Sequence, residues 1–300
     1  MTPNQATPHS ATPAAHAGAI TIGGELHVNR MGFGAMRITG QGIWGPPTDR
    51  GECVRVLRQA VELGVNFIDT ADSYGPFVSE EIIAEALHPY PADLVIATKG
   101  GLERPGPNKW TPNGRPEHLR RSLEGSLKRL KRDRIDLWQL HRIDSTIPAD
   151  EQFDVLREFV RDGTVRCIGL SEVNAKQIEQ AAQFVEVASV QNRYNIVDRE
   201  WDDVVDYCQR HGMAFIPWFP LAAGSIESSS DNANAHQIIE RVAKRHHATA
   251  MQIALAWLLA RSPATVVIPG TSKTDHVGEN IRAAEIELSE DELQELNQLG

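Results

Sequence analysis

The chain has no long apolar run and no excess of positive charge. Its longest apolar segment, residues 251–260, is interrupted by Gln252 and is far shorter than the roughly 20 apolar residues that a membrane-spanning helix requires. The 40 acidic residues outnumber the 30 basic ones, which gives a formal net charge of -10, whereas a broad nucleic-acid-binding surface requires a basic field. We therefore expect neither a membrane nor a nucleic acid as a partner.

Cysteines are scarce as well. Cys53, Cys167 and Cys208 are an odd number of thiols without the spacing of metal ligands. They predict free thiols in a reducing, cytoplasmic compartment and no metal site. Residues 1–18 are mostly Ala, Thr, Pro and His and lack the apolar core of a signal peptide. We expect a disordered tail over residues 1–18 and a single domain over residues 19–300.

The rest of the chain alternates between strand-like and helix-like segments. An alternating stretch around Gly23-Gly24 predicts a β-hairpin. Eight apolar runs follow, each succeeded by a segment of helical periodicity, and a capping box at Ser289 opens a final helix. This pattern predicts a (β/α)₈ TIM barrel with an N-terminal β-hairpin cap and extra C-terminal helices. The chain is long enough, since such a barrel commonly needs about 250 residues. The predicted strands cover residues 31–36, 67–69, 95–98, 137–140, 165–170, 188–190, 214–217 and 265–268.

Chemically active side chains stand where these strands end. Active sites of barrels lie at the carboxyl ends of the strands, where the following loops converge. A phenol, Tyr74, follows the end of the second strand by five residues. We therefore expect one site built from strand-end residues, namely Asp69, Lys99, His141, Ser171, Gln191, Trp218 and Ser272.

An acid, a phenol, an amine and an imidazole together favour proton donation to an oxygen. A phenol is a poor proton donor at neutral pH unless a nearby cation favours its phenolate. Lys99 is expected to supply that cation, and Asp69 to pair with Lys99 and keep it charged. His141 is expected to hydrogen-bond a carbonyl oxygen in the same cleft.

Three other interpretations of these residues are possible. Residues 40–45 match GxGxxG, but Pro46-Pro47 follow and the next helix begins several residues later, which disfavours a dinucleotide-binding Rossmann turn. A Schiff-base lyase using Lys99 is a second alternative, although pairing with Asp69 would keep the amine protonated and poorly nucleophilic. A non-catalytic, cofactor-sensing protein is a third alternative.

The constellation and its strand order resemble the aldo-keto reductase superfamily over the whole chain after the tail. Residues 29–36, with Gly45-Pro46-Pro47 and Asp49-Arg50, are similar to the bacterial group that includes pyridoxal reductases. The resemblance implies a barrel reductase with a catalytic tetrad of Asp69, Tyr74, Lys99 and His141, in which Tyr74 is the general acid. Its motifs are residues 32–36, residues 69–75, Thr98-Lys99, His141, residues 168–171, Val190-Gln191, residues 268–272 and Glu279-Asn280.

The resemblance also implies NADPH as the preferred cofactor, with NADH second, bound without a Rossmann fold. Ser171 and Gln191 match positions that hold the nicotinamide carboxamide, and Trp218 matches an aromatic that stacks on the ring. Glu172 departs from the usual Asn, and His276 stands where an arginine is often found, so Lys273 is expected to meet the 2′-phosphate. The cofactor-binding residues so implied are Gly34, Met36, Ser171, Gln191, Trp218, Leu221, Gly270, Ser272, Lys273, His276, Glu279 and Asn280.

Four residues in or beside the mouth loops are candidates for the substrate pocket, each with packing as the alternative role: Trp44, Trp110, Arg142 and Tyr194. Specificity is expected to depend on residues 39–47, residues 100–114 and the segment after Trp218, because barrels vary their chemistry through such loops. The expected substrate is a small carbonyl compound, with pyridoxal first and ketones of sugars, steroids or xenobiotics after it. A monomer is the default expectation.

Overall fold

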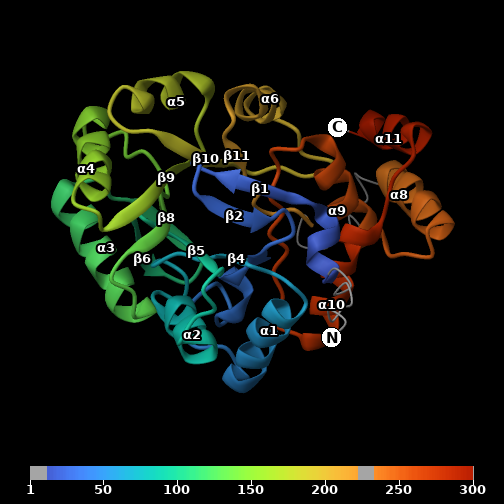
Figure 1. The fold of residues 1–300 in the computed structure, drawn as a ribbon, viewed down its shortest axis with the longest axis horizontal. Helices are drawn as coiled ribbons and strands as arrows, with labels where there is room; N and C mark the ends of the chain where they lie inside the picture. The colour runs from blue at the N-terminus through green and yellow to red at the C-terminus, as the bar shows by residue number, and fades with distance from the viewer. Residues whose placement is uncertain (1–11, 222–232, 300) are drawn as a thin grey trace, which may run out of the picture.

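The computed structural model describes residues 12–221 and 233–299. Its centre is a curved parallel sheet of seven strands in the order β11-β10-β9-β8-β5-β4-β3 (Figure 1). The strands are buried on both faces, which explains why they appear in the sequence as continuous apolar runs. They are β3 (Phe33–Gly34), β4 (Phe67–Asp69), β5 (Val95–Gly100), β8 (Ile135–Leu140), β9 (Val165–Ser171), β10 (Val187–Gln191) and β11 (Ala214–Phe215).

Residues 265–267 hydrogen-bond to both edges of this sheet. On one side the Val266 amide donates to the Phe215 carbonyl at 2.9 Å, and on the other the Gly32 amide donates to the Val267 carbonyl at 2.8 Å. Isolated parallel bridges mark the same two contacts. The predicted parallel α/β sheet is thus confirmed for seven strands, whereas the expected eighth strand is a short bridging segment.

Two glycines permit the close approach of backbone at this seam. A Cβ atom on Gly34 would lie 2.5 Å from the Ile268 carbonyl oxygen, and one on Gly270 would lie 2.3 Å from the Gly34 carbonyl oxygen. Both distances are shorter than van der Waals contact, so a larger residue at either position would push the two segments apart. Gly34 and Gly270 therefore help to hold the edges of the sheet together.

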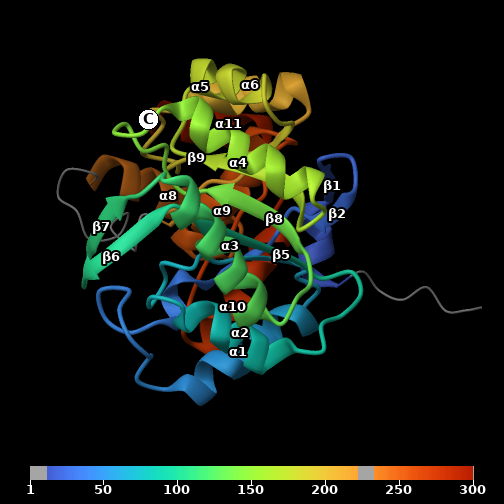
Figure 2. The same ribbon diagram turned by 90° about the vertical axis from the view of Figure 1, so that its left-hand side faces the viewer.

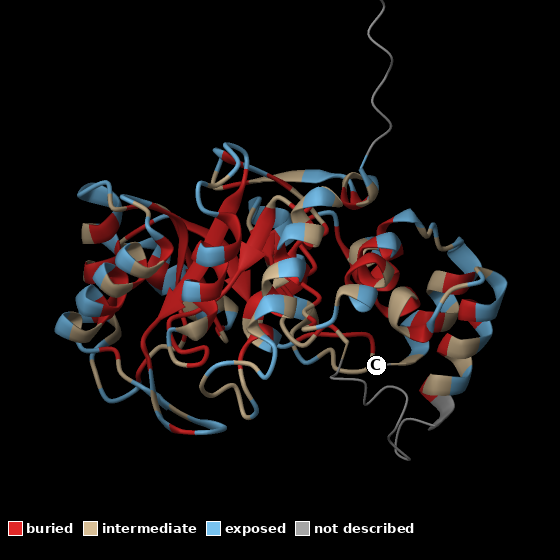
Figure 3. Ribbon diagram, turned by 90° about the horizontal axis from the view of Figure 1, so that it is seen from below, coloured by how far each residue is buried: buried red, intermediate tan, exposed pale blue. Residues whose placement is uncertain are grey.

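Helices cover the outer face of the sheet, with their buried sides inward (Figure 3). In the third helix, for example, Leu119, Leu123 and Leu130 are buried at helical spacing. The capping box predicted at Ser289 is present at the start of the final α-helix. The helices are α1 (Arg50–Glu62), α2 (Val78–Leu87), α3 (Pro116–Leu130), α4 (Ala149–Arg161), α5 (Ala175–Ala182), α6 (Asp202–His211), α8 (Ala233–Arg245), α9 (Ala250–Arg261), α10 (Thr274–Arg282) and α11 (Glu290–Leu296), and the 3₁₀ helices are η1 (Pro13–Ala17), η2 (Ala35–Ile38), η5 (Ala283–Glu285) and η6 (Asn297–Leu299).

Two hairpins project on opposite sides of the sheet (Figure 2). The first, β1 (Ala19–Ile22) with β2 (Leu26–Asn29), is the hairpin predicted around Gly23-Gly24. Its apolar side chains belong to one buried cluster with Phe67 and Val95 of the central strands. The second, β6 (Leu102–Gly106) with β7 (Lys109–Pro112), lies in a segment expected to be a long loop, so that expectation was wrong. It stands beside the carboxyl ends of the strands.

Residues 12–18 of the expected tail have a defined structure. Residues 13–17 form η1, in which Ala14 is fully buried and its amide donates to the Leu63 carbonyl at 3.0 Å. The expected disorder therefore does not extend to residue 18, because small alanine side chains fit against the end of α1. The rest of the expected tail, residues 1–11, lies outside the described residues.

All three cysteines are buried and form no disulfide, in line with the prediction of free thiols. Among residues 12–221 and 233–299, none of the helices combines the length and the apolar character that crossing a membrane requires.

Candidate active site

The four side chains expected to carry the chemistry meet at the carboxyl ends of β4, β5 and β8. The Lys99 ammonium donates to both carboxylate oxygens of Asp69, at 2.5 and 2.6 Å, and its Nζ lies 3.4 Å from the Tyr74 hydroxyl oxygen. The rings of Tyr74 and His141 meet edge to face, with centroids 6.0 Å apart. Lys99 has no exposed surface, so it reaches a substrate only through its neighbours.

The charge of Lys99 is set by two opposing influences. Burial alone would lower the pKa of the Lys99 amine, but the Asp69 carboxylate and the Tyr74 hydroxyl outweigh it and hold that pKa above its ordinary value. The amine is therefore a protonated ammonium at neutral pH. A protonated, fully buried amine is a poor nucleophile, which disfavours Schiff-base chemistry at this position.

Tyr74 is held as a neutral phenol. Burial raises the pKa of the Tyr74 hydroxyl above its ordinary value, while the Lys99 ammonium acts in the opposite direction. Lys99 acts on the Tyr74 pKa in the expected direction, but burial outweighs the cation. The hydroxyl keeps its proton at neutral pH and has a cation beside it for the moment when that proton leaves.

His141 is neutral. Burial lowers its pKa well below the ordinary value, and the positive charges of Lys99 and Arg142 lower it further. Its Nδ1 atom lies 3.3 Å from the Ser73 hydroxyl oxygen. A neutral imidazole carries one N–H donor, so His141 can orient a carbonyl oxygen without adding a charge.

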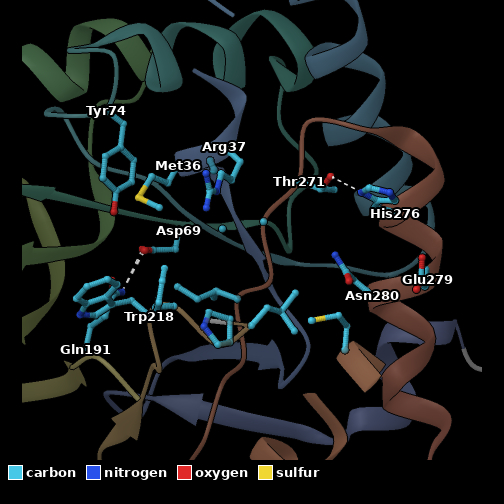
Figure 4. Close-up of a pocket in the computed structure, with 18 residues that line it drawn as sticks. Met36, Arg37, Asp69, Tyr74, Gln191, Trp218, Thr271, His276, Glu279 and Asn280 are labelled. Carbon is cyan, nitrogen blue, oxygen red and sulfur yellow. Dashed lines mark hydrogen bonds between the residues drawn. The ribbon is translucent and has the colours of Figure 1, made fainter. Parts of the chain in front are cut away.

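Two adjoining cavities meet at Tyr74. The first, of about 470 Å³, runs from Tyr74 and Asp69 to His276 and Glu279 on α10 (Figure 4). The second, of about 760 Å³, is lined by polar and aromatic residues of the mouth loops. Both cavities are lined by Met36, Arg37, Tyr74, Gln191, Trp218 and Phe219. A ligand in each cavity would therefore contact the other at the phenol.

The implied cofactor residues lie along these cavities, with one exception. Lys273 lines neither cavity and is exposed at the start of α10, next to Ser272. The first cavity is lined by Gly34, Met36, Gln191, Trp218, Leu221, Gly270, His276, Glu279 and Asn280, and Ser171 and Ser272 line the second.

The hydrogen-bonding groups of Ser171 and Gln191 fit a nicotinamide carboxamide. The Ser171 Oγ accepts from the Arg142 guanidinium at 3.0 Å, which leaves its own O–H to donate. The Gln191 amide nitrogen donates to Asp69 at 3.1 and 3.2 Å, and its Oε1 accepts from no residue that the structure describes. One free donor and one free acceptor match the C=O and NH₂ of a primary amide.

Glu172 holds Trp218 in place. Its Oε1 accepts from the Trp218 indole at 2.6 Å and from the Arg193 amide at 2.7 Å. The Glu172 backbone is left-handed, with φ of 57°, a conformation that costs free energy in a non-glycine residue and is often found at functional sites. The Glu172 carboxylate therefore fixes the orientation of the aromatic ring of Trp218.

Two of the four substrate-pocket candidates line the second cavity, and two do not. Trp110 and Arg142 belong to its wall. Trp44 is outside the lining and packs under the Arg104 guanidinium, 5.6 Å from its ring centre. Tyr194 has the packing role that was the alternative for each candidate: it is 1 % exposed, because its ring stacks against Trp257 in the core.

Arg104 is a residue of the mouth that the sequence did not predict. Its guanidinium donates to the carbonyls of Ser73 at 2.7 Å and of Ile43 and Lys109 at 2.8 Å, which joins three mouth loops. It also stacks on Trp110, 3.5 Å from the ring centre. The sequence feature that could have pointed to Arg104 is its place a few residues before a tryptophan in the same loop.

The sequence analysis also missed Arg37 and Phe219 as residues of the site. Residues 222–232 of the predicted specificity segment lie outside the described residues.

Known proteins resemble this chain over nearly its whole length. The model of the aldo/keto reductase family matches residues 30–300. An uncharacterized oxidoreductase of Schizosaccharomyces pombe is 48 % identical over 291 residues, covering 97 % of this chain and 92 % of the relative. Pyridoxine 4-dehydrogenase of Escherichia coli is 41 % identical over 280 residues, covering 91 % of this chain and 96 % of the relative.

Solved structures agree. A thermostable aldo-keto reductase in complex with the inhibitor epalrestat has a TM-score of 0.81 at 33 % identity, covering 94 % of this chain and 99 % of that one. An aldo/keto reductase of Klebsiella pneumoniae in complex with NADP and acetate has a TM-score of 0.77 at 26 % identity, covering 94 % of both chains. This chain therefore belongs to the aldo/keto reductase family and is an NAD(P)H-dependent oxidoreductase.

Proposed function

We propose that the protein reduces an aldehyde or ketone to an alcohol with NADPH, and that Tyr74 gives its proton to the carbonyl oxygen. The observation that carries the proposal is the position of Tyr74, whose ring lines both cavities while its hydroxyl oxygen lies 3.4 Å from the Lys99 ammonium. A nicotinamide held in the first cavity would supply the hydride. A carbonyl in the second cavity would then lie within reach of the Tyr74 proton.

The tetrad divides the work of proton transfer. As charge develops on the carbonyl oxygen, the Tyr74 O–H proton moves to it, and the Lys99 ammonium stabilises the phenolate that is left. Asp69 keeps Lys99 charged and oriented through two short hydrogen bonds. Neutral His141 donates a hydrogen bond that orients the carbonyl oxygen before the proton moves.

Cofactor binding is assigned to residues along the first cavity, together with Ser171 of the second cavity and Lys273 at the exposed start of α10. Ser171 and Gln191 would hold the carboxamide, and the Trp218 ring would stack on the nicotinamide with Glu172 fixing its orientation. Lys273 is proposed to meet the 2′-phosphate, which favours NADPH over NADH. The NADP in the Klebsiella pneumoniae structure supports this choice.

Pyridoxal is our first candidate substrate. The Escherichia coli relative named pyridoxine 4-dehydrogenase supports it, and the second cavity combines an aromatic wall at Trp110 with the charge of Arg142, which suits one polar aromatic ring. We further propose that residues 19–300 form a single monomeric (β/α)₈ barrel in which residues 265–268 serve as the eighth strand.

A reductase assay tests the proposal. Purified protein is incubated with NADPH or NADH and a panel of pyridoxal, sugar, steroid and xenobiotic carbonyl compounds, and oxidation of the cofactor is followed by absorbance. Tyr74→Phe is the matched control, because it removes the proton donor and keeps the ring. We expect turnover by Tyr74→Phe to be about 10²–10⁴-fold lower than turnover by wild type. NADPH binding should be retained. Equal turnover in both proteins would overturn the assignment.

A further inference from the structure

Arg142 is a half-buried cation without an acidic partner. Its Nη1 donates to the His141 carbonyl at 2.5 Å and to the Ser171 hydroxyl oxygen at 3.0 Å. It forms no ion pair with any carboxylate among the residues that the structure describes, and its Nη2 and Nε atoms have no hydrogen-bond acceptor there. A charge that is partly withdrawn from water and left unpaired costs free energy. Arg142 belongs to the wall of the second cavity.

The wall of this cavity carries charge of one sign. Arg37 and Arg142 are its charged residues, and no Asp or Glu is among the described residues that line it. The chain as a whole has a net charge of -10, so the charge of this cavity wall is opposite in sign to the net charge of the protein. The charge of Glu172 acts on Arg142 from outside this lining, but the two side chains form no ion pair, and the Glu172 Oε1 accepts from Trp218 and Arg193. A cleft with one sign of charge concentrates ligands of the opposite sign.

We infer that Arg142 binds an anionic oxygen of the substrate, so that the preferred substrates are aldehydes and ketones that also carry a carboxylate or phenolate. The inference rests on the proposed carbonyl reduction. Tyr74 and His141 line the same cavity as Arg142, so the carbonyl oxygen and the anion belong to one small molecule. Guanidinium N–H groups form strong, charge-assisted hydrogen bonds with such oxygens.

Pyridoxal belongs to this class, because a phenolate oxygen stands next to its aldehyde on the ring. Neutral sugars and steroid ketones do not belong to it. The inference therefore orders the candidate substrates by charge, which the catalytic tetrad alone does not do.

Matched substrate pairs test this role. The carboxylate arm compares 2-carboxybenzaldehyde with its methyl ester, and the phenolate arm compares pyridoxal with its 3-O-methyl ether. For each pair the ratio of kcat/KM, anion over neutral partner, is measured in wild type, Arg142→Gln and Arg142→Lys. We expect wild type to favour the anion and the ratio to fall by about 10–100-fold in Arg142→Gln, as for a lost hydrogen bond to a charged group. Arg142→Lys should restore part of the ratio.

Two controls separate substrate binding from other roles. Arg37→Gln removes a second, exposed guanidinium from the same cavity and should change the ratio much less, because water screens its charge. The NADPH dissociation constant is measured for every variant. A role of Arg142 confined to holding Ser171 would lower kcat/KM for both partners equally and leave the ratio unmoved.

The inference is overturned if the ratio of kcat/KM, anion over neutral partner, is the same in wild type and the Arg142 variants for both pairs. If wild type still reduces both neutral partners in that case, the proposed function stands. A loss of NADPH affinity as large as the change in ratio also overturns the inference, since Arg142 would then serve the cofactor. If wild type reduces no member of either pair, the inference and the proposed carbonyl reduction fall together.

Discussion

Replacing Asp69 with Asn removes the carboxylate that neutralises the buried Lys99 ammonium. Lys99 is 0 % exposed and Asp69 is 2 % exposed, and the Nζ atom lies 2.5 and 2.6 Å from the two carboxylate oxygens. Removing one partner of such a pair costs about 3–5 kcal/mol, because the remaining buried amine either stays charged without a partner or gives up its proton. We expect the free energy of unfolding, measured by urea denaturation at neutral pH, to fall by about that amount.

The same substitution should change the pH dependence of turnover. Without the carboxylate, burial lowers the pKa of Lys99, so the amine loses its proton at neutral pH and Tyr74 loses its neighbouring cation. We expect kcat to fall by about 10²–10⁴-fold. As the pH is lowered and Lys99 regains its proton, kcat of Asp69→Asn should partly recover, whereas wild type should show no such recovery.

Asp72→Asn is the matched control for this experiment. Asp72 is also a buried acid and lies three residues further along the chain, but it lines neither of the two adjoining cavities and accepts from Ser122. Its kcat should stay close to that of wild type. The reasoning is refuted if Asp69→Asn keeps the wild-type kcat and pH profile, or if Asp72→Asn loses activity to the same extent.

Three further predictions concern stability, the cofactor and the mouth loops. Burial raises the pKa of Asp72 to about 7, so the unfolded chain releases this proton at a lower pH than the folded protein does. The free energy of unfolding should therefore decline by about 4 kcal/mol through Asp72 as the pH rises from about 4 to about 7. Urea denaturation of Asp72→Asn should show a flatter dependence on pH, and an unchanged dependence would contradict that pKa. Glu172→Ala should raise the NADPH dissociation constant, read from tryptophan fluorescence, by about tenfold, whereas Glu172→Gln keeps an acceptor for Trp218 and should raise it less; equal weakening would point to the charge instead. Arg104→Met should raise KM for the carbonyl substrate by about tenfold by releasing three loops, with NADPH affinity unchanged, and a wild-type KM would rule out this positioning role.

The sequence alone was enough to predict which residues meet at the ends of the strands. Successive parallel strands in an α/β fold end at the same edge, so an acid, an amine and an imidazole at three strand ends had to converge. Asp69, Lys99 and His141 do so, and Tyr74 follows on the loop after β4. The resemblance to a family added roles to residues whose positions the strand pattern already indicated.

The tertiary structure decided what depends on contacts between loops. The hairpin of β6 and β7 brings Arg104 against carbonyls of two other loops, and the turn after β9 aims Glu172 at Trp218, which lies 46 residues further along the chain. Tyr194 follows β10 as a mouth residue would, yet its ring turns into the core. No local pattern encodes these directions, because they are set by the packing of segments that are distant in sequence.

The protonation of the site also required the fold. Local sequence suggests that a cation near a phenol lowers its pKa, and Lys99 does act in that direction on Tyr74. Burial nevertheless outweighs the cation, because desolvation depends on every neighbour that excludes water, including residues far along the chain. The sequence by itself determined which chemical groups meet at the strand ends. The folded structure determined their charge, their orientation and the cavities that they face.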